Sequence, residues 1–507
     1  MILLINPPLV KPSEPPPGIA RLYGTLVAAG VKCAVIDANI EGILHLFAKS
    51  PPDSDRWTRR AVRNRARNLE LVRSAPGYLD LQRYKRSVFD LNRLVGKSAQ
   101  SGGPVRLSLS DYQHSELSAV RARDLLGAAE NHQDNPFHEY FSKRISHALE
   151  FYSPDVVGVS LNYLSQALTA FAIIGFIRTR CERVRIVLGG SLVTSWVCRP
   201  GWTNPFSGLV DRIVSGPGEQ ALLDFAGINA IVRRRRFSYD PFPFEDYFAP
   251  GPILPYSASS GCYWNRCAFC PEKAEGNRYE PVSPEEAVRE ASELCSVSQP
   301  ALLHFLDSAI SPALLSKLSA NPPGAPWYGF VRVTRRLADE DFCRALKLSG
   351  CVMLKLGLES GDQGVIDSEG KGIDLAVASR ALASLKKAGI GAYVYLLFGT
   401  PSESEYEARK TLDFTVRHER FIDFLNLAVF NMPLNSPDAE RFATSPHYEG
   451  DLSLYTGFSH PKEWDRPKVR RFLETEFKRQ PAIARILSNE PPFFTSNHAP
   501  FFVRTLF

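Results

Sequence analysis

A strand-then-helix rhythm, repeated in two separate parts of the chain, most restricts how this protein can fold. Residues 1–48 are predicted to form a strand, a proline-rich turn, a helix, a second strand and a second helix. The rhythm returns over residues 155–214. Alternating strands and helices form parallel sheets, because each helix crosses a face of the sheet before the next strand begins. We therefore predict that residues 1–230 form a doubly wound, Rossmann-like α/β domain.

Small and polar residues follow the strands predicted in this domain. They are Pro7, Pro8, Ser160, Asn162, Gly189, Gly190, Ser191 and Gly216. A doubly wound sheet binds ligands beyond the carboxyl ends of its strands, where small residues let the backbone approach a ligand closely. The same residues would also suit ordinary turns. No G-x-G-x-x-G motif follows the first strand, which argues against a dinucleotide site.

Residues 49–153 differ in composition and are predicted to be a helical insertion within this domain. One helical stretch holds arginines at positions 59, 60, 63, 65, 67 and 73, and further helices are expected over residues 79–95, 116–129 and 137–151. Basic helices usually face solvent; the alternative is a cap that closes over the ligand or receives an acidic partner. Five prolines between Tyr239 and Pro255 favour an extended linker, which we place at residues 231–252.

The second strand-then-helix series runs over residues 253–437. Six strands are expected, over residues 253–258, 301–305, 328–333, 353–356, 393–398 and 424–430. Six such units indicate a partial (β/α)6 barrel of the TIM type, with its chemistry on the loops that follow the strands. Residues 438–507 lose this pattern and end in an aromatic, proline-rich segment. We expect this C-terminal extension to close the open side of the barrel and to help shape the substrate pocket.

Three cysteines follow the first strand of the predicted barrel. Cys262, Cys267 and Cys270 have the spacing C-x4-C-x2-C. Three thiolates on one loop can hold three irons of a [4Fe–4S] cluster and leave the fourth iron open to a ligand. A zinc site would need further ligands, for which only the isolated cysteines at positions 295, 343 and 351 lie downstream. Structural thiols are the third possibility.

This loop resembles the radical S-adenosylmethionine (SAM) superfamily, in which an aromatic residue such as Phe269 precedes the last cysteine. The common spacing there is C-x3-C-x2-C, and the longer spacing in this chain resembles a cobalamin-binding subgroup that includes enzymes acting on ribosomally made peptides. The resemblance spans about residues 1–437. It implies that Asp307 and Ser308 end the second strand at the SAM amino group, that Glu359 ends the fourth at the ribose, and that Gly399 ends the fifth beside the adenine.

Each implied role has a structural alternative. Asp307 could cap the next helix, and Glu359 could pair with a lysine or arginine of the barrel. Arg332 points from the third strand and could meet the SAM carboxylate or form a structural ion pair. His304 lies on an apolar strand, where a histidine is usually a core residue, and Phe269 could also belong to the core.

The resemblance also implies that the N-terminal domain binds cobalamin at the carboxyl edge of its sheet. The D-x-H-x-x-G signature, which supplies a histidine to cobalt, is absent from the sequence. The similar run from Asp37 to Gly42 has asparagine at the histidine position and follows the second strand, so we regard it as chance. We expect a lower cobalamin face without a histidine ligand, bordered by residues 7–17, 160–163 and 189–194.

Composition adds limits on location and partners. The 507 residues carry a net charge of +6, which does not by itself indicate nucleic acid as a partner. There is no run of 18 apolar residues and no charged segment ahead of the apolar start, so we expect neither a membrane span nor a signal peptide. Nine mostly scattered cysteines fit a reducing compartment, the cytoplasm.

Together these features predict an enzyme that cleaves SAM to a 5′-deoxyadenosyl radical and methylates an unactivated carbon through methylcobalamin. A radical rearrangement, ring contraction or oxidation without methyl transfer is the alternative enzyme, and a cobalamin- or cluster-binding sensor is the alternative of another class. The substrate would be a peptide or a small molecule. The resemblance also implies an electron donor such as flavodoxin or ferredoxin.

Overall fold

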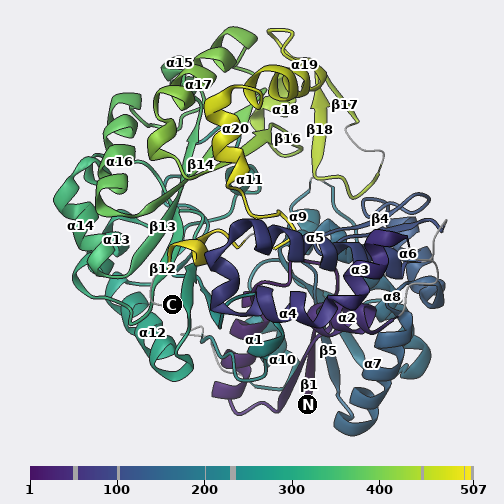
Figure 1. Ribbon diagram of the computed structural model, residues 1–507. Helices are drawn as coiled ribbons and strands as arrows, with labels where there is room; N and C mark the ends of the chain where they lie inside the picture. The colour runs from purple at the N-terminus through teal and green to yellow at the C-terminus, as the bar shows by residue number, and fades with distance from the viewer. Residues whose placement is uncertain are drawn as a thin grey trace. The chain divides into compact units, whose positions relative to one another are not determined.

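A computed structural model describes residues 1–49, 55–99, 103–199, 201–228, 236–446, 450–495 and 497–503. These residues form two compact units (Figure 1). The first unit comprises the described residues up to Pro252 together with 450–454 and 492–495, and the second comprises the remainder from Ile253 onward.

A five-stranded parallel sheet forms the centre of the first unit. The strand order is β2-β1-β5-β6-β7. The strands are β1 (Ile2–Asn6), β2 (Cys33–Asp37), β5 (Val156–Ser160), β6 (Arg185–Gly189) and β7 (Arg212–Ile213). Every residue of β1 and β5 is buried, as expected for strands covered on both faces. The order reverses between β1 and β5, and a doubly wound sheet binds its ligand at such a switch point.

The helices that follow these strands are α1 (Pro17–Ala28), α2 (Ala38–Ala48), α8 (Leu164–Arg180), α9 (Ser191–Val197) and α10 (Glu219–Phe225). Local sequence explains their starts. Pro17 occupies the first position of α1, where a missing N–H costs nothing, and the Asp37 carboxylate caps α2 by accepting from the Asn39 and Ile40 N–H groups. Twelve residues of α8 are buried, so α8 is a core element of this unit.

The insertion is helical, as predicted, but less completely. Its helices are α3 (Arg56–Arg63), α4 (Arg65–Arg73), α5 (Leu81–Ser98), α6 (Ala122–Glu130) and α7 (His138–Tyr152). The helix expected from residue 116 begins only at Ala122. A hairpin of β3 (Val105–Leu107) and β4 (Tyr112–His114), which we did not predict, precedes it. Three residues per strand are too few for a visible alternation of apolar and polar positions.

Residues 236–252, expected to be a linker, belong to the first unit. The rings of Tyr239, Phe242, Tyr247 and Phe248 are buried there. The Tyr247 hydroxyl donates to the Asp37 carboxylate at 2.5 Å, and the Phe248 N–H donates to the Pro12 carbonyl at 2.7 Å. The prolines keep this segment irregular. Burial of its aromatic side chains contributes free energy of folding that an exposed linker would not provide.

The second unit contains the six predicted strands in a single parallel sheet, in the order β15-β14-β13-β12-β11-β8. The strands are β8 (Ile253–Tyr256), β11 (Leu302–Phe305), β12 (Trp327–Val331), β13 (Cys351–Glu359), β14 (Gly391–Phe398) and β15 (Phe424–Val429). Each strand lies next to the one before it in this series, as in a barrel and unlike the doubly wound first unit.

The helices between these strands follow one another around the outside of the sheet (Figure 1). They are α12 (Pro284–Ser298), α13 (Pro312–Ala320), α14 (Glu340–Leu348), α16 (Leu375–Ala388) and α17 (Glu405–Arg417). Ser283, Ser311 and Ser404 cap the amino ends of α12, α13 and α17 with their side chains. Asp307 therefore does not cap α13, as we had considered.

Short elements complete the second unit. They are β9 (Ser259–Ser260), β10 (Glu280–Pro281), α11 (Pro271–Ala274), α15 (Gln363–Ser368), β16 (Met432–Pro433), β17 (Thr444–Pro446), β18 (Tyr455–Phe458), α18 (Pro437–Arg441), α19 (Arg466–Phe472) and α20 (Pro481–Ser488). None of the helices in the described part of the chain has both the length and the apolarity that crossing a bilayer requires.

Residues 497–503 lie at the amino ends of β14 and β15. A side-chain carbon on Gly391, the first residue of β14, would lie 2.7 Å from the Phe502 ring. The His498 ring lies 4.4 Å from the ring of Tyr393, and the Leu425 N–H donates to Glu490 at 2.6 Å. These contacts place Glu490, His498 and Phe502 at the end of the sheet that lies opposite the carboxyl ends of the strands. That the C-terminal extension closes the open side of the barrel and helps shape the substrate pocket stays a prediction.

Candidate functional site

The three cysteines lie on a loop at the carboxyl end of β8. Gly261, just before Cys262, has φ +66°, and a side chain there would overlap the Arg278 carbonyl oxygen. Cys267 is buried and the other two cysteines are half-buried; all three are free thiols. Burial raises the pKa of Cys267 to about 11 and also raises the pKa of Cys270. Iron binding would have to deprotonate these thiols, which couples cluster assembly to proton release.

Trp264, inside the four-residue spacer between Cys262 and Cys267, attaches the loop to residues 369–372. Its indole N–H donates to the Gly370 carbonyl at 2.9 Å. Gly372 has φ +64°, and a side chain there would overlap the Trp264 ring. The Ala268 N–H donates to the Glu369 carbonyl at 2.9 Å. The longer spacer thus provides room for an aromatic anchor that holds the loop against the segment after α15.

Arg332 packs against this anchor. Its guanidinium lies 3.6 Å from the centre of the Trp264 ring and donates to the Lys371 carbonyl. Arg332 is buried, and its Nε has no hydrogen-bond partner among the described atoms. No ion pair with a described carboxylate accompanies it. An unpartnered, buried guanidinium nitrogen beside the cysteine loop suits an anionic ligand group.

Glu359 ends β13 and forms an ion pair with Lys371, with Oε1 and Nζ 2.7 Å apart. The register of β13 against β14 shifts here, and Glu359 has φ +69°. A side chain at Gly357 would lie within 2.8 Å of both charged groups, so glycine at that position leaves room for the pair. The Lys371 ammonium also lies 5.5 Å from the centre of the Phe269 ring. Glu359 therefore forms the ion pair that was the structural alternative to its predicted role. It does so at the end of the fourth strand, where the resemblance implies contact with the ribose.

Asp307 supports the chain just ahead of the cysteine loop. Its carboxylate accepts from the Ala258 N–H at 3.1 Å and from the Ser259 hydroxyl at 2.5 Å. Burial raises the pKa of Asp307. The neighbouring Ser308 donates to Glu272 at 3.2 Å. Asp307 therefore anchors the cysteine loop, whatever ligand it also meets.

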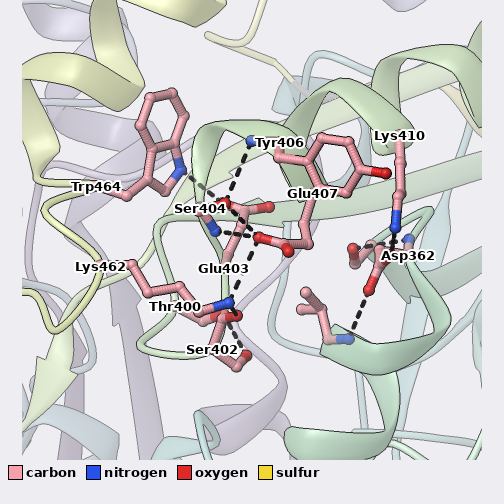
Figure 2. Close-up of polar contacts among 12 residues, drawn as sticks. Asp362, Thr400, Ser402, Glu403, Ser404, Tyr406, Glu407, Lys410, Lys462 and Trp464 are labelled. Carbon is pink, nitrogen blue, oxygen red and sulfur yellow. Dashed lines mark hydrogen bonds and ion pairs between the residues drawn. The ribbon is translucent and has the colours of Figure 1, made fainter.

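The turn after β14 is built around a buried glutamate that the sequence did not reveal (Figure 2). The Gly399 N–H donates to Glu403 at 2.5 Å, and the Trp464 indole N–H donates to the same oxygen at 2.9 Å. Burial raises the pKa of Glu403 to about 8. Trp464 and the nearby Lys462, which donates to the Ser402 carbonyl, lie some sixty residues further along the chain. Only a conserved pairing of Glu403 with Trp464 across homologues could have indicated this contact.

The interior of the barrel holds His304. Its ring stacks on Tyr328, with 4.2 Å between ring centres, and its Nε2 lies 2.9 Å from the Lys355 ammonium. His304 is buried, as expected for a core residue.

At the carboxyl edge of the first unit, the predicted ligand residues hydrogen-bond to one another. Asn162 donates to the Ser160 hydroxyl at 3.0 Å and accepts from the Ser191 N–H at 3.0 Å. Gly190 has φ +114°, and a side chain there would overlap the Leu161 carbonyl. Gly216 has φ +75° and open space around it, whereas a side chain on Gly189 would make ordinary contacts with Val214. Pro7 accepts from the Gln166 side chain at 2.7 Å, and Pro8 follows it in the same turn.

No described histidine of the first unit lies on these turns: they occur in α2, β4, α7 and the short turn before α7. Asp37, in the run that partly matches the histidine signature, is engaged by Asn6 and Tyr247 and caps α2. That run is therefore explained by its local structure. Nor do any three His, Cys, Asp or Glu side chains of the described residues converge as they would around a single metal ion.

Comparison with known proteins identifies the second unit. The family model described as the radical SAM superfamily matches residues 256–415. The chain contains a radical SAM domain. An uncharacterized methyltransferase of Pyrococcus horikoshii is 24% identical over 325 residues, which are 56% of this chain and 68% of that protein.

Two solved structures share the fold over most of the chain. One is the radical SAM methyltransferase TsrM from Kitasatospora setae, solved with a tryptophan substrate and a SAM analog. The match covers 97% of this chain and 89% of the TsrM chain, with a TM-score of 0.57 and 15% identity. The cobalamin-dependent radical SAM enzyme OxsB covers 91% of this chain and 64% of its own, with a TM-score of 0.57 and 12% identity. At such identities the likeness is one of fold.

A radical SAM domain implies a [4Fe–4S] cluster and SAM, and the residues present fit both. A cubane cluster binds each thiolate through a different iron, so it does not need the close convergence of ligands that a single ion needs. The loop supplies three free thiols, and Arg332 supplies a buried donor. Of the residues predicted from the resemblance, Phe269, Asp307, Glu359 and Gly399 all lie on the carboxyl side of this sheet. Lys371, Trp264 and Glu403 are the neighbours that the sequence did not single out.

Proposed function

We propose that this protein is a cobalamin-dependent radical SAM enzyme that methylates an unactivated carbon of a peptide or a small natural product. The observation that carries the proposal is the free three-cysteine loop at the carboxyl end of the first barrel strand. A methyltransferase-named relative and a fold shared with TsrM and OxsB over more than nine-tenths of the chain support it.

In this proposal Cys262, Cys267 and Cys270 hold the cluster and Arg332 faces the carboxylate of SAM. Glu359 accepts from the ribose hydroxyls while Lys371 holds its carboxylate in place. Gly399 brings backbone close to the adenine, and Asp307 with Ser308 faces the amino group. These residues position SAM and exclude water from it.

The carboxyl edge of the first unit is the proposed cobalamin site, since the strand order reverses there. Ser160, Asn162 and Ser191 offer neutral donors and acceptors, and Gly190 and Gly216 keep side chains away from the cofactor. We propose a lower cobalamin face without a histidine ligand. When bound, the cofactors supply the bond chemistry: reductive cleavage of SAM to a 5′-deoxyadenosyl radical and delivery of a methyl group.

Anaerobic reconstitution with iron, sulfide and cobalamin, followed by methyl-labelled SAM and a chemical reductant, tests the proposal without a known substrate. We expect label to appear in methylcobalamin and 5′-deoxyadenosine to form slowly. Flavodoxin or ferredoxin should replace the chemical reductant.

The alternatives give different results. Deoxyadenosine without labelled methylcobalamin would indicate a cobalamin-dependent rearrangement, ring contraction or oxidation. A protein that binds both cofactors and forms neither product would be a sensor. Histidine nitrogen bound to cobalt, seen by electron paramagnetic resonance, would contradict the proposed lower face.

A further inference from the structure

Positive charge in this chain is concentrated in three helices of the insertion. Residues 56–98 carry twelve lysines and arginines and three aspartates and glutamates, a net charge of +9, whereas the whole chain carries +6. The remainder of the protein is therefore slightly acidic. The basic character belongs to α3, α4 and α5 and not to the protein as a whole.

Four of these arginines form a stripe. Arg56, Arg59 and Arg63 recur at helical spacing on one face of α3, and Arg67 continues the spacing in α4, which begins one residue after Asn64. All four side chains are exposed. We call these four residues the arginine stripe. Arg60, the remaining arginine of α3, is not part of it, because it is held at 2.7 Å by the buried Asp90 of α5.

The stripe opposes the stability of the helices that carry it. Like charges three and four residues apart on a helix repel one another, and Arg56 stands at the positive end of the α3 dipole. Arg56, Arg63 and Arg67 form no ion pair with a described carboxylate. By contrast, the exposed Arg60 and the half-buried Arg93, which lie beside the stripe, are paired with Asp90 and Asp55. Arg56, Arg63 and Arg67 are therefore available to acceptors that a ligand supplies.

The stripe cannot turn inward, because the opposite side of these helices is packed. Thr58 and Ala61 of α3 and Val72 of α4 are fully buried. Trp57 fixes α3 to α5: its indole N–H donates to Asp90 at 2.7 Å, and the Arg93 guanidinium lies 4.8 Å from its ring centre. The charged face is thus held outward on a rigid support.

These contacts favour an acidic polypeptide over other anionic partners. Single-stranded nucleic acid is bound by basic grooves that also offer aromatic rings for base stacking. Trp57 is the exposed aromatic residue of α3, but Arg93 covers its ring and Asp90 takes its N–H. A membrane-surface helix would need its apolar side free to enter lipid, and here that side is buried. Carboxylates need neither feature and pair directly with guanidinium groups.

We propose that the arginine stripe binds an acidic segment of a polypeptide substrate. This inference rests on the proposed function and narrows it, since it selects a peptide substrate over a small natural product. Asp and Glu side chains of the substrate would bind the arginines of α3 and α4. This acidic segment would be separate from the substrate residue that is modified.

The test uses the full-length holoenzyme and fluorescence anisotropy. The probe is a fluorescein-labelled peptide of alternating Glu and Ser, and the comparison probes are the matching Gln–Ser peptide, single-stranded RNA of equal charge and vesicles containing phosphatidylserine. The stripe variant is Arg56→Gln, Arg63→Gln and Arg67→Gln together. The matched control is Arg380→Gln, Arg470→Gln and Arg479→Gln, three exposed arginines outside the insertion that also lack a described ion pair.

We expect the Glu–Ser peptide to bind the wild type and the control equally, to bind the stripe variant at least about tenfold more weakly, and to lose affinity with added salt. Equal weakening in the control, tighter binding of RNA or vesicles than of the peptide, or unchanged binding to the stripe variant would overturn the inference. Circular dichroism checks that α3 and α4 remain folded. SAM cleavage and cobalamin content are measured on the same samples, because their loss would count against the proposed function and not against this surface.

Discussion

The carboxyl edges of the two parallel sheets are built from different chemistry. The edge of the barrel gathers ionisable side chains: Asp307, Arg332, Lys371 and Glu403, which are buried, and Glu359, which is half-buried. The edge of the first sheet carries neutral groups, Ser160, Asn162 and Ser191, that hydrogen-bond mainly to one another. Such a difference suits a small, charged ligand at the barrel edge. It suits a large ligand, contacted mostly by backbone atoms, at the edge of the sheet in the first unit.

The difference also has an energetic side. A buried charge is stable only when it is paired and hydrogen-bonded, so each charged group at the barrel edge depends on a named neighbour. The neutral edge depends on shape, because its glycines adopt backbone angles that other residues resist. Removing a hydrogen-bond or ion-pair partner should therefore disturb ligand binding most at the barrel edge. Adding a side-chain atom should disturb it most at the neutral edge.

Loss of a cluster cysteine should have the largest effect. We expect Cys262→Ala, Cys267→Ala or Cys270→Ala to remove the cluster and to lower SAM cleavage by at least about a thousandfold, because no nearby side chain can replace a thiolate. Iron content, visible absorption and deoxyadenosine formation measure this. Cobalamin content should not change if the two edges are independent.

Cys181→Ala is the control, since Cys181 follows α8 in the first unit. A cluster retained in all three loop variants, or lost equally in the control, would contradict the assignment of the loop.

Removal of Lys371 should come next. Lys371→Met leaves the Glu359 carboxylate without its partner, which costs several kcal/mol in a fully buried pair and less here, since Glu359 remains partly exposed. We expect the Kd for SAM to rise by about tenfold to a hundredfold. Equilibrium binding of SAM to the reconstituted protein measures it.

The pair of the exposed Lys386 and the half-buried Asp423, with 2.9 Å between its charged atoms, provides the matched control. Lys386→Met should change SAM affinity by less than about threefold. A cycle with Glu359→Gln should show that the two losses are not additive. Additive losses would mean that Lys371 does not act through Glu359.

At the barrel edge, the sequence predicted the residues that belong to a motif but not the residues that support them, and the reason is physical. The cysteine loop was predicted from its spacing, and Asp307 and Gly399 were predicted from the family resemblance that this spacing carries. Their supports were not found. Trp264 depends on Gly370 and Gly372, about one hundred residues away, and Glu403 depends on Trp464. Such pairs have no local pattern, since only the folded barrel brings them together.

Both parallel sheets were predicted from the rhythm of apolar runs, but the structure of the irregular segments was not. Aromatic burial decided the position of residues 236–252, where we had weighed the prolines more heavily. The ring of Phe502 against Gly391 placed residues 497–503 at the amino ends of the strands. In both segments tertiary packing outweighs local composition.

Glu403 should make the stability of the barrel unit depend on pH. Its pKa is about 8 in the fold and about 4.5 in the unfolded chain, so the folded protein holds a proton over this window that the unfolded chain releases. Stability should therefore fall as pH rises from about 5 to 8, by up to about 1.4 kcal/mol per pH unit from this group. Denaturant unfolding of the wild type and of Glu403→Gln at several pH values measures the difference.

Glutamine keeps an acceptor for the Gly399 and Trp464 N–H groups but has no proton to lose. The variant should therefore gain stability relative to the wild type as pH rises through the window. Parallel pH profiles would show that Glu403 does not titrate as its burial indicates.

The smallest effects are expected at the neutral edge, where two glycines form a matched pair. Gly190→Ala places an alanine at a positive φ, where its side chain would also overlap the Leu161 carbonyl. Gly216→Ala places an alanine at a positive φ without any overlap. An alanine at positive φ costs about 1 kcal/mol, and the overlap should add a further ~1–3 kcal/mol at Gly190. Thermal unfolding of the apoprotein measures both costs. If the edge also receives cobalamin as proposed, Gly216→Ala should weaken cobalamin binding by more than its small cost in stability explains, because its new methyl group would occupy space that is otherwise open to the ligand.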